Sequence, residues 1–391
     1  MKFLFTTHPM YGHFHAMAPL AIEAQARGHQ VAFASGAGFG DAIRRAGLTA
    51  FPCGLDFDGS HDIFQALPEW KSIQARYPAS LGVQQLIGFV EALAPKMLDG
   101  LIPLVDAWQP DLIIRDPLEY GGYLAAEKAG LPHAAITWAV YIPAQALCPG
   151  SLYELRQRYG LAPDPGLESL DRDLVLNFLP HSWDFSGSPV ETVIERFCAP
   201  PFDQSGNESL PGWVYYQPDR PTVHVTLGTT FNRSPQTFKA ILSALSAEKV
   251  NVIVTVGRSM DPQQLQPLPG HIKVAQYIPQ TLLLPHCDAV VFHGGYNTLH
   301  SALWHGLPMV LIPLGGGDQV PNARRCQQLG VGVVVDSDPP DVDELRAAVR
   351  AILEQPEYRA RARQLQEEMR SLPPLSKAVD RLERLIEAHN G

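Results

Sequence analysis

Residues 287–323 read CDAVVFHGGYNTLHSALWHGLPMVLIPLGGGDQVPNA. The apolar run 289–292 predicts a buried strand, which leads through a turn of one histidine and two glycines into a helical pattern over 297–304. A second apolar run, 308–312, predicts another strand after Gly306. A strand, a helix and a second strand in this order predict a βαβ unit of a parallel sheet.

The same alternation of strands and helices occurs along both halves of the chain. In the first half we expect strands at 2–6, 30–34, 111–114 and 133–138, with helices at 17–27 and 120–129. In the second half we expect strands at 222–227, 250–256, 271–275, 289–292, 308–312 and 332–335, a helix at 235–247, and helices from 341 to 389. The predicted fold class is α/β, with two doubly wound, Rossmann-like parallel-sheet domains that face a cleft.

The stretch between about 149 and 221 breaks this rhythm with Pro, Gly, Ser and aromatic residues, and we place the domain junction near 200–220. The predicted parts are an N-terminal domain 1–205, a linker 206–220, a C-terminal domain 221–375 and a helix 376–391 that returns to the N-terminal domain. Ligands of such folds bind outside the carboxyl ends of the strands, so function is expected in the strand-to-helix loops.

Composition narrows the classes of function. The chain has 391 residues, 46% of them hydrophobic, and a net charge of -10, which disfavours nucleic acid and anionic membranes as partners. Five widely spaced cysteines indicate neither a disulfide framework nor a zinc site, and no uninterrupted apolar stretch reaches the roughly 18 residues of a membrane span. The opening MKFLFTTHPM lacks the layout of a secretory signal, so we expect a cytoplasmic protein, as a monomer or a homodimer, without stable membrane insertion.

The turn after the strand 289–292 has the features of an anion site. Glycines allow close backbone approach, and the start of a helix presents free N–H groups and a positive partial charge. His293, Asn297 and Thr298 add further donors, so the turn can hold a diphosphate. The alternative is an ordinary capped turn with a structural histidine.

Several motifs resemble one known family. HGGYNT, GLPMVLIP and DQVPNA look like the donor-site signature of the family 1 glycosyltransferases, which have the GT-B fold. VAQYIPQTLLLPHCD at 274–288, VTLGT at 225–229 and the opening at 8–35 are similar to further motifs of that family in the same order. The length and the segments DQVPNA and VTVGRSMDP resemble the bacterial antibiotic and macrolide branch, which includes natural-product UDP-glycosyltransferases.

The resemblance implies a role for each matched residue. Tyr277, where the family usually has Trp, would stack on the nucleobase, Ile278 would read the base edge through its backbone, and Gln280 would meet the ribose. The residues that would hold the diphosphate are Gly228, Thr229, His293, Gly295, Asn297 and Thr298. Asp318 and Gln319 would bind the sugar hydroxyls.

The loop after the first strand places an imidazole, His13, at the carboxyl edge of a sheet, where it can act as a general base on an acceptor hydroxyl. Asp116, at the place the family uses for its orienting carboxylate, would fix its tautomer. The alternatives are a satisfied loop histidine and an Asp-Pro turn starter. The implied reaction is an inverting, metal-independent transfer of a hexose from a UDP- or dTDP-sugar, with no other cofactor.

The four Asp-x-Asp pairs, 56/58, 171/173, 336/338 and 341/343, fall outside the matched motifs and are interpreted as solvated acids.

The acceptor is expected over the N-terminal domain. Phe64, Trp70, Trp138 and Tyr141 would form its apolar floor, which favours a hydrophobic small-molecule aglycone such as a polyketide or another phenolic. The alternative is that these aromatic residues belong to the core.

Three other functions stay open at this point. His13 and His15 form an HxH pair that could share a metal in a hydrolase. Gly36, Gly38 and Gly40 weakly resemble a nicotinamide-binding loop, although they follow the second strand rather than the first. A non-catalytic helper that binds a nucleotide sugar would share the fold.

Overall fold

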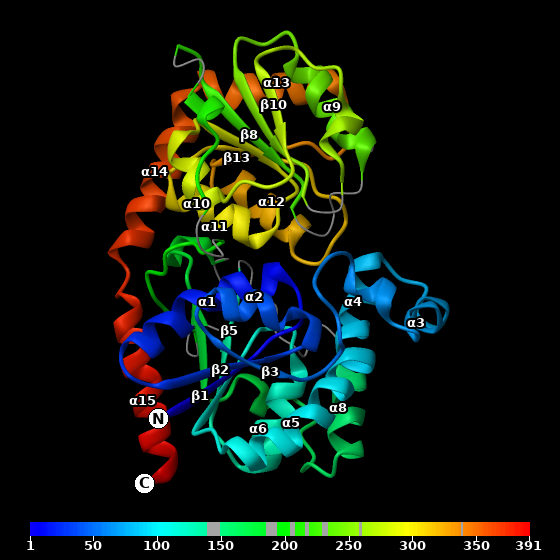
Figure 1. Cartoon of the computed structure of the whole chain (residues 1–391), viewed down its shortest axis with the longest axis vertical. Coiled ribbons are helices and arrows are strands. Elements are labelled where there is room, and N and C mark those ends of the chain that lie inside the picture. The colour runs from blue at the N-terminus through cyan, green and yellow to red at the C-terminus, as the bar shows by residue number, and fades with distance from the viewer. Residues whose placement is uncertain are drawn as a thin grey trace. The chain divides into compact units, whose positions relative to one another are not determined.

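The structure, a computed structural model, describes residues 1–138, 149–184, 194–203, 208–215, 219–228, 234–257, 260–337 and 339–391. The chain forms two compact units, one of Met1–Phe202 with Leu372–Gly391 and the other of Asp203–Ser371. Each unit holds one parallel sheet with helices against it (Figure 1), so the predicted α/β class with two parallel-sheet domains is confirmed. The boundaries proposed from the sequence, after 205 and 375, lie close to this division, and the proposed linker falls within the second unit. No helix in the described ranges is long and apolar enough to cross a membrane.

The first unit is built on a seven-stranded sheet in the order β3-β2-β1-β4-β5-β6-β7. Its strands are β1 (Lys2–Thr6), β2 (Gln30–Ser35), β3 (Thr49–Pro52), β4 (Leu112–Arg115), β5 (His133–Ile136), β6 (Leu174–Asn177) and β7 (Ile194–Arg196). Its helices are α1 (Tyr11–Ala26), α2 (Gly40–Arg45), α3 (Trp70–Arg76), α4 (Leu81–Gly88), α5 (Ala94–Trp108), α6 (Tyr120–Ala129), α8 (Pro149–Arg158) and α15 (Leu375–Asn390). A π-helical turn, Phe89–Leu93, joins α4 to α5.

Both faces of this sheet are buried, as the continuous apolar runs predict for a parallel sheet. Along β1, Phe3 and Phe5 point to one face and Leu4 to the other, because successive side chains of a strand alternate. The cluster around Phe3 and Phe5 also contains apolar side chains of α15, which packs on α1 (Figure 1). The C-terminal helix therefore completes the core of the N-terminal unit.

The second unit is built on a six-stranded sheet in the order β10-β9-β8-β11-β12-β13. Its strands are β8 (Thr222–Thr226), β9 (Asn251–Thr255), β10 (Ile272–Ala275), β11 (Ala289–Phe292), β12 (Met309–Leu311) and β13 (Gly332–Val334). Its helices are α9 (Pro235–Leu245), α10 (Gln280–Leu283), α11 (Tyr296–Trp304), α12 (Gln319–Gln328), α13 (Val342–Glu354) and α14 (Pro356–Ser371). Local sequence sets the helix starts: Ser234 and Asp341 accept backbone N–H groups at the first turns of α9 and α13.

Two expectations about local structure are wrong. The region 149–221, interpreted as a break in the pattern, contains α8, β6 and β7. Its strands have only three or four residues, too few for a periodic signal between Pro- and Gly-rich turns. The first helix begins at Tyr11 rather than near 17, because Gly12 and the histidines that follow hide its first turn and Pro19 interrupts its pattern.

Each sheet reverses its winding at one point, between β1 and β4 in the first unit and between β8 and β11 in the second. Ligands of doubly wound sheets bind at the carboxyl ends of the strands at such a switch point, because the loops diverge there. The loops after β4, β8 and β11 contain Asp116, Gly228 and His293, and the first turn of the helix after β1 contains His13, all of which the sequence singles out.

Candidate active site

His13 and Asp116 meet at the switch point of the first unit. His13 lies in the first turn of α1, and Asp116 follows the last residue of β4. The Nδ1 atom of His13 is 3.0 Å from Oδ2 of Asp116, and both residues are buried. A carboxylate can only accept a hydrogen bond, so this contact places a proton on Nδ1 and leaves Nε2 of neutral His13 as an acceptor.

The Asp116 carboxylate is the centre of a hydrogen-bond cluster. Besides His13, its Oδ2 accepts the Thr7 hydroxyl at 3.1 Å and the His8 N–H at 3.3 Å, and its Oδ1 accepts the Leu118 N–H at 2.8 Å. Burial alone would raise the pKa of Asp116, but the neighbouring imidazoles and the N–H donors hold that pKa below its ordinary value. Asp116 is therefore an anion at neutral pH and orients the ring of His13.

His293 lies at the switch point of the second unit, directly after β11, and its ring is enclosed by two glycines. A Cβ atom on Gly228 would lie 2.5 Å from Cε1 of the ring, and one on Gly295 would lie 2.5 Å from Nε2. Gly228 also has a φ of +77°, which other residues rarely adopt. Burial lowers the pKa of His293 to about 4, so the ring is neutral near pH 7 and has one N–H to donate.

Helix α11 starts beside this ring. Its N-cap is Gly295, which offers no side-chain cap. The Tyr296 N–H donates to Oδ2 of Asp318 at 3.1 Å, and the Asn322 amide donates to the same oxygen at 2.9 Å. The structure thus gives Asp318, predicted to bind sugar hydroxyls, contacts that order the loop before α12.

Gln319 and the predicted nucleoside residues also have partners within the unit. Gln319 is buried, and its Oε1 accepts the Leu314 N–H at 2.8 Å. The Gln280 amide donates to the Thr298 hydroxyl at 3.0 Å, which joins a predicted ribose contact to a predicted diphosphate contact. Ile278 is buried, and the ring of Tyr277 is exposed, as a surface for stacking requires. Asn297 lies half-buried in the first turn of α11, and Thr229 lies outside the described residues.

Comparison with known proteins identifies the family. The N-terminal domain of the family described as erythromycin biosynthesis protein CIII-like matches residues 22–228, and its C-terminal domain matches residues 239–385. The chain belongs to this family. It is a glycosyltransferase, which confirms the resemblance of its motifs and excludes the nicotinamide enzyme and the hydrolase.

Named relatives match this chain over nearly their full length. The 3-alpha-mycarosylerythronolide B desosaminyl transferase of Saccharopolyspora erythraea is 28% identical over 429 residues, covering 98% of each chain. The tylactone mycaminosyltransferase of Streptomyces fradiae is 28% identical, covering 100% of this chain and 93% of its own. The crystal structure of glycosyltransferase VinC in complex with dTDP is 27% identical with a TM-score of 0.78, covering 99% of this chain and 100% of that chain.

Sequence reasoning missed two residues that the glycosyltransferase places beside the predicted ones. His8 is buried, its Nε2 lies 3.1 Å from the Leu118 carbonyl oxygen, and its ring lies edge-on to His13 with centroids 5.7 Å apart. Burial, with a smaller effect of His13, lowers the pKa of His8 to about 4, so His8 is neutral near pH 7. No spacing rule marks this histidine in the sequence.

Asp203 is the second missed residue. Its carboxylate accepts the Gln280 N–H and the Thr281 hydroxyl, the latter at 2.6 Å, and its backbone carbonyl accepts the Tyr277 hydroxyl. Burial raises the pKa of Asp203 despite these donors. Asp203 therefore fixes the loop that carries the predicted nucleoside contacts, from 74 to 78 residues away in the chain.

The predicted acceptor residues lie in different environments. Phe64 is buried in the core cluster and packs against Trp70 with ring centroids 4.7 Å apart. Trp138 packs edge-on against His13 at 4.5 Å, which places it at the candidate base. Tyr141 lies outside the described residues. An open hollow in the same unit is lined by residues of α3, the π-helical turn and α8.

The basis of the HxH interpretation is wrong. His13 and His15 lie on helix α1 and not on an extended segment, and residues two apart on a helix do not face the same point. His15 packs instead against Tyr11 and Phe202. Among the described residues no group of three or more His, Cys, Asp or Glu side chains is arranged to hold a metal.

The interpretation of the acidic pairs as solvated is wrong for 171/173. Oδ1 of Asp171 accepts a hydrogen bond from the buried guanidinium of Arg115 at 2.7 Å, and Oδ1 of Asp173 forms an ion pair with Arg172 at 2.9 Å. Asp341 caps α13.

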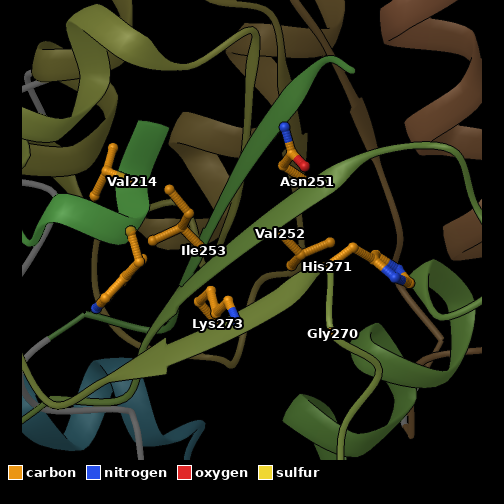
Figure 2. A pocket seen from close by; sticks show the side chains of 8 residues that line it. Val214, Asn251, Val252, Ile253, Gly270, His271 and Lys273 are labelled. Atoms are coloured by element: carbon orange, nitrogen blue, oxygen red, sulfur yellow. The ribbon is translucent and has the colours of Figure 1, made fainter. Parts of the chain in front are cut away.

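A hollow in the second unit lies away from the donor residues. It is shallow and is lined by residues such as Val214, Asn251, His271 and Lys273 (Figure 2). Asn251 begins β9 and His271 precedes the first residue of β10, so this hollow adjoins the amino ends of these strands. The candidate donor residues lie at the opposite, carboxyl edge of the sheet, where the fold places ligands.

Proposed function

We propose that this glycosyltransferase transfers a hexose, in an inverting and metal-independent reaction, from a nucleoside-diphosphate sugar to a hydroxyl of a hydrophobic small-molecule aglycone. The observation that carries this proposal is the buried 3.0 Å contact between His13 and Asp116. It supports a fixed imidazole whose Nε2 takes the proton of the acceptor hydroxyl while the oxygen attacks the anomeric carbon. A single displacement of this kind inverts the configuration at that carbon.

The leaving diphosphate needs compensation for its developing charge. His293 would supply an N–H donor and the start of α11 a positive partial charge, and preorganised groups of this kind lower the barrier without reorganisation. No step of this mechanism requires a metal ion. The exposed ring of Tyr277 supports stacking on the nucleobase, with Gln280 near the ribose.

The relatives favour particular substrates. VinC was solved with dTDP, and the named relatives are a desosaminyl transferase of 3-alpha-mycarosylerythronolide B and a mycaminosyltransferase of tylactone. We therefore propose a dTDP-sugar ahead of a UDP-sugar, and an aglycone of polyketide type. Trp138, which packs on His13, supports an apolar acceptor surface at the base.

Two measurements test this function. A thermal-shift series with dTDP, UDP, GDP and NAD should show stabilisation by dTDP or UDP, and stabilisation by NAD alone would contradict the donor assignment. His13→Ala should lower turnover by roughly 100-fold or more, the size of a lost general base, with nucleotide affinity kept.

His15→Ala, on the same helix, is the matched control and should keep turnover. If His13→Ala weakens nucleotide binding and turnover equally, or keeps its turnover, the role of base is wrong. A protein that binds dTDP but transfers no sugar to any polyketide aglycone would be a non-catalytic helper.

A further inference from the structure

Two short loops bring His13 and Asp116 together, and His8 joins these loops. The first loop, 7–10, leads from β1 into α1, and the second, 116–119, leads from β4 into α6. His8 lies in the first loop and is buried. Its backbone and its ring each form hydrogen bonds that reach the second loop.

The ring of His8 is bonded to the loop that contains Asp116. Its Nε2 atom lies 3.1 Å from the Leu118 carbonyl oxygen, which can only accept, so this contact places a proton on Nε2. Because burial lowers the pKa of His8 to about 4, its ring is neutral near pH 7 and donates through Nε2 alone. The Leu118 N–H in turn donates to Oδ1 of Asp116 at 2.8 Å. Both polar groups of the Leu118 backbone are thus held, one by the His8 ring and one by the Asp116 carboxylate.

The backbone of His8 is bonded to the same carboxylate and to the start of α1. Its N–H donates at 3.3 Å to Oδ2 of Asp116, the atom that also contacts Nδ1 of His13. Its carbonyl oxygen accepts the Met10 N–H at 2.7 Å, and the Met10 carbonyl oxygen accepts the His13 N–H at 3.1 Å. A displacement of His8 would therefore shift the carboxylate and the imidazole relative to each other.

The rings around His13 add a second restraint. The His8 ring lies edge-on to His13 with centroids 5.7 Å apart, and both rings pack against Phe89, His8 at 4.9 Å and His13 at 5.8 Å. Trp138 packs on His13 at 4.5 Å. His13 therefore has little room to rotate away from Asp116.

We propose that His8 is a positioning residue of the transfer reaction: its Nε2–H holds the loop that presents the Asp116 carboxylate to Nδ1 of His13. This proposal rests on the function proposed for His13. The tautomer of a neutral imidazole is set by the partner of its other nitrogen, so a loosened loop should leave some molecules with the His13 proton on Nε2. In that tautomer Nε2 cannot accept the proton of the acceptor hydroxyl.

Three substitutions separate the hydrogen bond of His8 from the packing of its ring. The amide of His8→Gln reaches the place of Nε2 and can still donate to Leu118, whereas the amide of His8→Asn ends near the place of Nδ1 and falls short. His8→Phe keeps a ring against Phe89 and His13 but has no donor.

The first readout is the rate of sugar transfer at saturating substrates. In His8→Asn and His8→Phe, kcat should fall by roughly 10-fold, the size of about one lost hydrogen bond, while the KM for the nucleotide sugar stays unchanged. In His8→Gln, kcat should stay within about threefold of the wild type, because the donor to Leu118 is kept.

His224→Phe is the matched control. His224 is also buried, its Nδ1 lies 3.1 Å from the Ile253 carbonyl oxygen, and burial lowers its pKa to about 4 as it does for His8. It lies on β8, in the second unit. His224→Phe should lose a comparable part of the free energy of unfolding and keep kcat.

The tautomer of His13 is a second readout, which a merely structural role of His8 would not move. Nitrogen NMR of histidine-labelled protein at about pH 9, well above the ordinary pKa of an imidazole, distinguishes a ring nitrogen that carries a proton from one that does not. The wild type and His8→Gln should have the His13 proton on Nδ1, and His8→Asn and His8→Phe should have a mixture of the two tautomers. The signals of His13 are assigned by their absence in His13→Ala.

The outcomes separate this proposal from the function on which it rests. Folded His8→Asn and His8→Phe proteins that keep the wild-type tautomer of His13 overturn the proposal, whatever their kcat. A His8→Gln protein that loses about 10-fold in kcat also overturns it, because the donor to Leu118 would then not be the group that matters. A mixture of tautomers at unchanged kcat would uphold the positioning by His8 and refute His13 as the base. If His8→Phe does not fold, the tautomers of His8→Asn and His8→Gln decide alone.

Discussion

Asp116→Asn removes the negative charge of the carboxylate that contacts Nδ1 of His13, and it leaves the shape of the Asp116 side chain nearly unchanged. Oδ2 of Asp116 accepts hydrogen bonds from three donors, and Oδ1 accepts one hydrogen bond, from the Leu118 N–H. The asparagine therefore loses least when its amide oxygen replaces Oδ2 and its NH₂ group faces the Leu118 N–H. In this orientation His13 keeps its hydrogen bond but loses the anion that stabilises the imidazolium formed during proton transfer.

The expected loss follows from these contacts. A hydrogen bond to a charged partner contributes about 1.5–3 kcal/mol, against about 0.5–1.5 kcal/mol for a neutral one. The difference, about 1–2 kcal/mol in the transition state, corresponds to roughly a 5- to 30-fold lower kcat. The half-buried Leu118 N–H would also lose its acceptor, which costs about 1 kcal/mol of the free energy of unfolding.

The assay is the initial rate of glycoside formation at saturating nucleotide sugar, with urea unfolding as the measure of stability. Asp173→Asn is a matched control, because Asp173 is a largely buried carboxylate of the same unit that accepts the His133 N–H at 3.1 Å. It should lose stability and keep kcat. A folded Asp116→Asn protein with kcat within about twofold of the wild type would refute the role assigned to the carboxylate, because the neutral partner would then serve as well as the charged one.

Three further predictions concern the second unit. His293→Ala should weaken the binding of free dTDP by roughly 10- to 100-fold in calorimetry, the value of one lost charge-assisted hydrogen bond, and unchanged affinity would remove His293 from the diphosphate site. Asp203→Asn should raise the KM for the nucleotide sugar by about fivefold at nearly constant kcat, since it loosens the loop held at Gln280; a lower kcat with constant KM would contradict this. His224 is fully buried, and burial lowers its pKa to about 4. As the pH falls from 6.5 to 4, His224 should therefore reduce the free energy of unfolding, because its imidazole is protonated in the unfolded chain but stays neutral in the folded protein. His224→Leu should therefore reduce the pH slope of that free energy by about 1.4 kcal/mol per pH unit in urea unfolding, and an equal slope would show that His224 is protonated in the fold.

The sequence predicts the central elements of both sheets well. The runs 2–6 and 289–292 and the helix 120–129 match β1, β11 and α6, because each is an uninterrupted apolar or helical pattern between clear turn signals. The missed strands β3, β6 and β7 lie toward the two edges of the first sheet and have three or four residues. Strands of this kind depend on pairing with a neighbour more than on their own pattern, so their local sequence indicates them only weakly.

The candidate site was predictable where it lies in loops after central strands. His13 and Asp116 follow two such strands, and the structure brings them into contact. Asp203 and His8 were not predictable in the same way. Asp203 meets Gln280 only through the fold, 77 residues away, and the ring of His8 meets that of His13 only because the chain turns between β1 and α1.

The return of α15 to the first unit sets the rule for building hybrid enzymes from this chain. A second unit exchanged with that of a relative must be cut at two places, after Phe202 and before Leu372, because a single crossover would pack a foreign terminal helix against the core of the first unit. A hybrid with one crossover would then destabilise the first unit, even when the exchange was meant to change only the second. A fusion partner or affinity tag attached to Gly391 likewise adjoins the unit that contains His13. A tag at the amino end perturbs this unit less only if Lys2, the first residue of the central strand β1, keeps its place.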